Sequence, residues 1–194
     1  MKTTAMIAIT CVLGCLGLVA SSTQKPMRET TSDALFSPPP STLAEMIDGV
    51  TAVALGTISA SRGTSFTLAG GHDAVATEYS VAVSEVFGGR NVTPGSSITV
   101  ISLGGELDRG TYIERNIVPG VKPLTVGHKY ILFLNWDSTH SSYVLAYGPS
   151  AVLEDDNGHA VAHGDTGPLK SIHGRAWAEA VRAVAERHLP RQRP

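Results

Sequence analysis

The sequence predicts a mainly β protein, either a closed barrel or a β-sandwich, with one helix before the strands and one after them. Two observations carry this prediction. Short segments alternate apolar and polar residues, as half-buried strands do, and most of them end at glycine or Asn-Gly turns. No segment repeats at a fixed period. We therefore expect about six to eight short, mostly antiparallel strands.

A capping box at Thr42 and Glu45 predicts the first helix, over residues 42–48, because each side chain can accept the backbone N–H of the other residue. Gly49 ends this helix. Its apolar face consists of Leu43, Met46 and Ile47.

The strands follow in order, separated by glycine-rich or loose polar segments. A long Ser/Gly/Thr stretch at residues 59–73 is expected to be a hairpin loop. Residues 130–134 are apolar at every position, so this strand should be buried on both faces. Asn157-Gly158 indicates a tight hairpin between the last two strands. The predicted strands are residues 53–58, 78–87, 97–102, 112–118, 130–134, 143–147, 151–153 and 159–161.

A second helix is predicted over residues 176–189, ended by Pro190. The single β-rich domain then covers residues 42–189, and residues 190–194 form a short basic tail. The apolar stripe of this helix consists of Trp177, Ala180, Val181, Val184 and Ala185.

Residues 1–21 are typical of an export signal, with Lys2 before an apolar run and small residues at its end. Two processing routes stay open. The sequence before Cys15 resembles a lipoprotein box, which makes Cys15 a lipidation candidate, and the residues before Ser22 resemble an ordinary cleavage site. Both cysteines of the chain lie in the signal, so the mature domain is expected to fold without a disulfide.

Residues 22–41 are rich in serine, threonine and proline and end in Pro38-Pro39-Pro40, which is typical of a stiff tether. Roughly 150 residues follow the signal and tether, enough for one domain with a sizeable core. A cysteine-free exported domain of this size favours a bacterial envelope over eukaryotic secretion.

The order of these motifs is similar to that in uncharacterised exported bacterial proteins. The matching segments are the V-x-x-G-x-I strand at residues 53–58, the T-x-Y-x-V-x-V-x-x-V strand at residues 77–86, I-T-V with Gly-Gly at residues 98–105, and V-G-x-x-Y-I-L-F-L at residues 126–134. This resemblance implies an OB-like antiparallel barrel of the tissue-inhibitor-of-metalloproteinases and netrin type. Inhibitors of that type chelate zinc through a mature N-terminal cysteine with a free amine. This chain has no such cysteine, since a lipidated Cys15 would carry a blocked amine.

Two groups of residues are candidates for a site. Glu106, Asp108 and Arg109, with the aromatic residues Tyr112 and Trp136, could line a binding cleft. His159 and His163, near acidic residues, could hold a divalent metal ion. The alternatives are a solvated loop for the first group and a solvated turn for the second.

Formal net charge is −2, and about −3 without Lys2, which does not favour a nucleic-acid partner. The sequence has no nucleophile elbow, phosphate loop or His-Glu-x-x-His motif. We therefore expect an exported, non-catalytic binding or adaptor module without a cofactor, whose partner is a protein or glycan of the envelope. Membrane contact is expected only through a lipid on Cys15. The alternative is a metal-dependent or acid–base hydrolase that uses the clustered His, Asp and Glu residues.

Overall fold

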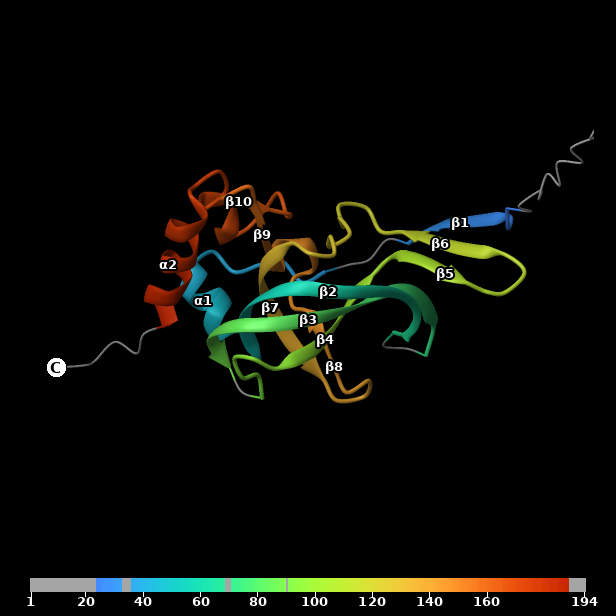
Figure 1. The fold of residues 1–194 in the computed structure, drawn as a ribbon, viewed down its shortest axis with the longest axis horizontal. Coiled ribbons are helices and arrows are strands. Elements are labelled where there is room, and N and C mark those ends of the chain that lie inside the picture. The colour runs from blue at the N-terminus through green and yellow to red at the C-terminus, as the bar shows by residue number, and fades with distance from the viewer. Residues whose placement is uncertain (1–23, 33–35, 69–70, 90, 189–194) are drawn as a thin grey trace, which may run out of the picture.

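The computed structural model describes residues 24–32, 36–68, 71–89 and 91–188 (Figure 1). The predicted signal, including Cys15, lies outside these residues. The described chain is mainly β, with two sheets and two α-helices, which confirms the predicted class. Within these ranges, no helix is both long and apolar enough to cross a membrane.

The larger sheet has seven strands, and its pairings close on themselves. In spatial order the strands are β10 (His159–Ala162), β9 (Val152–Asp156), β7 (Lys129–Asp137), β2 (Ala52–Thr67), β3 (Asp73–Gly89), β4 (Ser97–Leu103) and β8 (Ser142–Leu145). β8 pairs in parallel with β4 and antiparallel with β7, so that β7, β2, β3, β4 and β8 form a closed circuit of hydrogen-bonded neighbours. β9 and β10 extend the sheet beyond β7.

Two apolar clusters pack on opposite faces of this sheet, and β7 contributes to both. Tyr130, Leu132 and Leu134 belong to the first cluster, which lies among the strands of the circuit. Ile131 and Phe133 belong to the second, which the helices cover. All five side chains are fully buried, as their continuous apolar sequence predicted.

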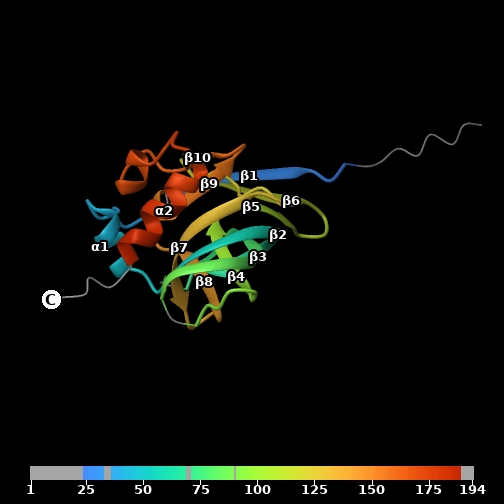
Figure 2. The same cartoon turned by 60° about the vertical axis from the view of Figure 1, so that its left-hand side comes forward.

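The two α-helices lie side by side at one end of the molecule (Figures 1 and 2). α1 (Leu43–Asp48) has the predicted capping box, with the Thr42 hydroxyl accepting the Glu45 N–H at 3.2 Å. α2 (Trp177–His188) buries Ala180 and Val184 of its predicted stripe. Two short 3₁₀ helices, η1 (Gly148–Ala151) and η2 (Pro168–Ser171), lie between β8 and α2 in the sequence.

The expected loop at residues 59–73 is wrong over most of its length. β2 continues to Thr67 and pairs with β3 as far as Asp73. Most residues of this extension are exposed or half-buried, which explains their polar composition. Ladder hydrogen bonds join backbone groups, so a Ser/Thr/Gly segment can form a strand when a partner strand lies beside it.

The smaller sheet projects from the opposite end of the molecule to the helices (Figures 1 and 2). It consists of β1 (Met27–Thr31), β6 (Ile113–Ile117) and β5 (Gly105–Asp108), in that order. The sequence predicts β6 as a strand but β5 as part of a solvated loop. β1 lies inside the predicted tether and pairs with β6 in parallel, so this part of the tether is a strand. Long-range pairing of this kind leaves little signal in the local sequence.

Candidate functional site

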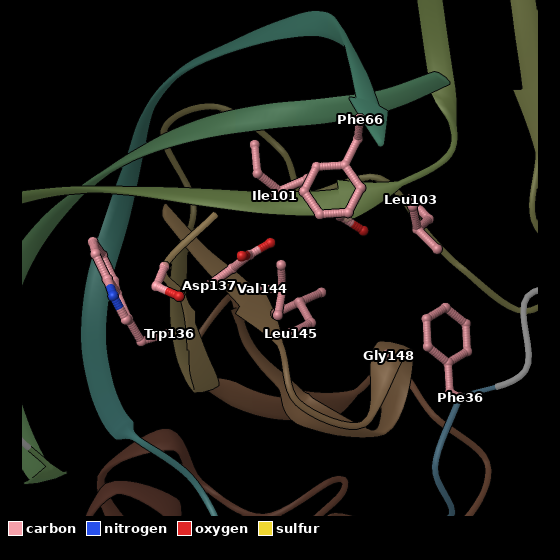
Figure 3. A pocket seen from close by; sticks show the side chains of 11 residues that line it. Phe36, Phe66, Ile101, Leu103, Trp136, Asp137, Val144, Leu145 and Gly148 are labelled. Atoms are coloured by element: carbon pink, nitrogen blue, oxygen red, sulfur yellow. The ribbon is translucent and has the colours of Figure 1, made fainter. Parts of the chain in front are cut away.

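We call the paired ends of β2 (residues 60–67) and β3 (residues 73–80) the β2–β3 extension. A groove opens between the end of this extension and the β7–β8 turn at residues 138–141. Its volume is about 420 Å³. β4 contributes Ile101 to the groove, β8 contributes Val144 and Leu145, and the β2–β3 extension contributes Phe66. In Figure 3 Trp136 lies on one side of the groove and Phe36 on the other. We call this concavity the β4–β8 groove.

Trp136 is the most accessible aromatic side chain of the groove, with 42% of its surface exposed. Its ring meets Tyr143 edge to face, with the centroids 5.0 Å apart and an interplanar angle of 67°. Tyr143 is buried, and burial raises the pKa of its hydroxyl. The buried tyrosine therefore supports an indole that remains available to a ligand.

The β7–β8 turn is held by Asp137, which also lines the groove. Its carboxylate accepts a hydrogen bond from Nδ1 of His140 at 2.7 Å and another from the Thr139 N–H at 2.9 Å. The His140 bond is the main reason why the pKa of Asp137 lies below its ordinary value. His140 in turn packs on Phe66, with the ring centroids 4.3 Å apart, so that the turn and the β2–β3 extension contact each other.

A more polar hollow of about 290 Å³ adjoins the groove and shares Phe66 and Ile101 with it. Arg62 and Glu78 form a bidentate salt bridge there: Nε and Nη2 of Arg62 each donate a hydrogen bond of 2.9 Å to one carboxylate oxygen of Glu78. Ser142 also lines the hollow, and its buried hydroxyl has no hydrogen-bond partner among the described residues. The groove and hollow together present an apolar surface beside hydrogen-bonding groups.

The structure separates Trp136 from the other predicted cleft residues, which lie on the smaller sheet or its turn. Each of them has a partner there. The Arg115 guanidinium binds Glu106, the Lys25 ammonium lies 2.8 Å from Asp108, Arg109 lies 2.8 Å from Glu114, and Arg28 lies over the Tyr112 ring at 4.3 Å. These predicted cleft residues form ion pairs at the surface, and Glu106 lines a different concavity of about 500 Å³ beside the smaller sheet. Of the predicted cleft residues, Trp136 is the one that lines the β4–β8 groove.

The two candidate metal ligands, His159 and His163, lie in different environments. His159 is exposed at the start of β10, whereas His163 is buried and its Nε2 lies 2.7 Å from Glu154. The other Glu154 oxygen binds Nδ1 of His128 at 2.7 Å and the Tyr130 hydroxyl at 3.1 Å. Among the described residues, no three His, Cys, Asp or Glu side chains are arranged to hold a metal ion.

Sequence reasoning missed most of the groove. The sequence predicts a loop around Phe66, a tether at Phe36, and strands that contain Ile101, Val144 and Leu145 with no indication that these side chains line a groove. The exposed Trp136 beside an apolar strand was the one usable signal.

No protein-family model matches the chain, and no curated protein matches it. The groove's own geometry therefore carries the functional argument.

Proposed function

We propose that the protein is an exported, non-catalytic binding module of the cell envelope and that its ligand occupies the β4–β8 groove. The observation that carries this proposal is the exposed Trp136 indole in a groove that is lined mainly by apolar residues and adjoins a polar hollow. Exposed aromatic residues in concave apolar surfaces are typical of binding sites.

The proposed architecture is an OB-like barrel of the tissue-inhibitor-of-metalloproteinases and netrin type. Five strands, β2, β3, β4, β7 and β8, pair in a closed circuit, which favours a barrel over an open sandwich. OB barrels bind ligands on the face of their second and third strands, between the first–second and fourth–fifth connections. The β4–β8 groove has the corresponding position, on β4 and between the β2–β3 extension and the β7–β8 turn.

The lining favours a peptide over a glycan as the ligand. Ile101, Val144 and Leu145 form an apolar floor that suits an apolar side chain. The Arg62–Glu78 pair, whose guanidinium is largely exposed, could meet polar groups of the same ligand. A protein segment with an apolar residue beside a polar one supplies both kinds of group.

Export is part of the proposal and rests on the signal-like residues 1–21. Lipidation of Cys15 would hold the module at the membrane, whereas cleavage before Ser22 would release it. The position of the groove is compatible with both routes, since it lies on the folded domain.

Site-dependent capture from envelope extracts tests the proposal. The mature protein and its Trp136→Ala variant are immobilised, together with a Val126→Ala control that truncates an apolar side chain 50% exposed and outside the groove. We expect a ligand that the wild type and Val126→Ala retain and Trp136→Ala loses by about tenfold or more. Equal retention by all three proteins contradicts the proposal. Recovery of a glycan instead of a protein would correct the ligand class.

A spectroscopic measurement places the captured ligand. The chain has two tryptophans, so Trp177→Phe leaves Trp136 as the single indole. Ligand binding in the groove should shift the emission of Trp136 to shorter wavelength, because the indole loses contact with water. An unchanged emission at saturating ligand contradicts binding in the groove.

A further inference from the structure

Residues 36–40, Phe-Ser-Pro-Pro-Pro, cross the surface of the domain next to the β4–β8 groove. We call this segment the strap. Phe36 lies against Gly148, where a Cβ atom would stand 2.5 to 2.6 Å from three carbons of the phenyl ring (Figure 3). Pro39 lies against Gly167, where a Cβ atom would stand 2.6 Å from Cγ of the proline. Only glycine leaves room for these two contacts.

The strap leaves open space on both of its sides. A hollow of about 480 Å³ lies between the strap and the surface formed by Tyr147, Pro149 and Gly167, and the β4–β8 groove begins on the other side of Phe36. Phe36 and Pro39 are half-buried, whereas Ser37 and Pro38 are exposed. The strap is therefore a ligand-like segment on a concave surface and not a buried part of the core.

Side-chain contacts hold the strap in place. Among the described residues, no hydrogen bond joins residues 36–40 to the rest of the domain, and three of the five residues are prolines, which have no N–H to donate. Proline-rich segments lose little conformational entropy on binding, and aromatic-lined grooves recognise them through their rings. Tyr147 supplies an aromatic ring on this surface.

We propose that Tyr147, Gly148, Pro149 and Gly167 form a recognition site for an extended peptide with phenylalanine three positions before proline, and that the strap occupies this site in cis. The two glycines set this spacing, since each makes room for one of the two rings. This site shares Phe36 and Gly148 with the edge of the β4–β8 groove but does not include Trp136, so variants of Trp136 and of Gly167 test the two proposals separately. A peptide of the same chemistry from another chain must displace the strap, whose effective concentration is on the order of millimolar.

The probe is the peptide Phe-Ser-Pro-Pro-Pro-Ser, acetylated and labelled for fluorescence anisotropy. The full chain with Phe36→Ala and Pro39→Ala presents the vacated site, and the wild type presents the occupied one. We expect the double variant to bind the probe about tenfold more tightly than the wild type, because the competing strap has lost both rings. Binding should weaken by about tenfold or more when alanine replaces phenylalanine in the peptide.

Two glycine substitutions in the double variant provide the matched comparison. Gly167→Ala fills the site for proline and should abolish probe binding. Gly174→Ala has a similar positive φ, +79° against +87°, but no atom lies within 4 Å of its Cβ position, so binding should persist. Trp136→Ala should also leave probe binding unchanged, because Trp136 lines the groove and not this surface.

The proposal is overturned if the folded double variant does not bind the probe or binds the alanine peptide equally well. It is also overturned if Gly167→Ala binds like Gly174→Ala, or if Trp136→Ala removes binding, since the peptide would then lie in the groove. If the double variant does not fold, Phe36→Ala alone is the second variant, because it keeps the contact of Pro39 with Gly167. Failure of both variants to fold would make the strap a structural element and would equally overturn the proposal.

Discussion

The carboxylate of Glu154 lies 2.7 Å from Nε2 of His163, an imidazole with only 3% of its side-chain surface exposed. The same carboxylate binds His128 and Tyr130, so this cluster joins β9 to the start of β7 and to the segment after β10. Burial opposes ionisation of Glu154, but the hydrogen bonds from His163, His128 and Tyr130 outweigh it and hold its pKa below the ordinary value. The ionised carboxylate is therefore a stabilising part of the fold.

Glu154→Gln should lower the free energy of unfolding at pH 7 by about 2 kcal/mol, as expected when hydrogen bonds to a charged group are weakened. A group whose pKa is lowered by folding stabilises the protein above its unfolded-state pKa and stops doing so as the pH falls through its folded-state pKa. The difference between wild type and variant should therefore shrink below about pH 4.3.

Urea unfolding followed by circular dichroism at several pH values measures this difference. Glu85→Gln is the control, because Glu85 is exposed on β3 and should contribute little at any pH. A difference for Glu154→Gln that stayed constant or grew in acid would refute the assigned role of the carboxylate.

Phe133→Ala should destabilise the domain by about 3–5 kcal/mol, because this fully buried ring packs in the cluster between the sheet and the helices. Phe133→Leu keeps most of the volume and should cost less. The half-exposed Val126→Ala should change stability by about 0.5 kcal/mol or less. Chemical denaturation gives all three values, and equal effects of Phe133→Ala and Val126→Ala would contradict the observed core.

Gly63→Ala should disturb the contact between β2 and the smaller sheet. A Cβ atom at Gly63 would stand 1.8 Å from the Glu106 carbonyl oxygen, so β5 must move or the chain must strain by about 1–3 kcal/mol. Hydrogen exchange should then accelerate in β5 and β6 more than in β7. Ser65→Ala, an exposed position on the same strand, is the control. Unchanged exchange in β5 would show that the two strands do not approach this closely.

The mature N-terminus should begin at Cys15 or at Ser22, and intact-mass spectrometry of the protein from its native host separates the two. A diacylglyceryl mass on Cys15 indicates a lipid-anchored module, whereas a free Ser22 indicates a released one. An unprocessed Met1 on protein recovered from the cytoplasm would contradict export by either route.

Local signals in the sequence were sufficient for the helices and for the central strand. The capping box needs only Thr42 and Glu45, three residues apart, and the helical stripe of residues 177–185 repeats every three or four residues. Residues 130–134 could be assigned as a doubly buried strand because every side chain there is apolar. Each of these features depends on neighbours in the chain.

The site could not be predicted in the same way. Phe36, Phe66, Ile101 and Trp136 are up to 100 residues apart, and the pairing of β4 with β8 helps bring the walls of the groove together. The sequence groups Glu106, Asp108 and Arg109, but only the tertiary structure brings them their partners Arg115, Lys25 and Glu114, which lie on β6 or before β1.

The sequence by itself determined the mainly β class, the two helices and the strand buried on both faces, because periodicity and capping act over a few residues. Only the tertiary structure decided that β8 pairs with both β4 and β7, that β1 joins β6, and that Phe36 lies on Gly148. The physical reason is that ladder hydrogen bonds join backbone groups common to all residues, so partners distant in the chain are chosen by the packing of the whole domain.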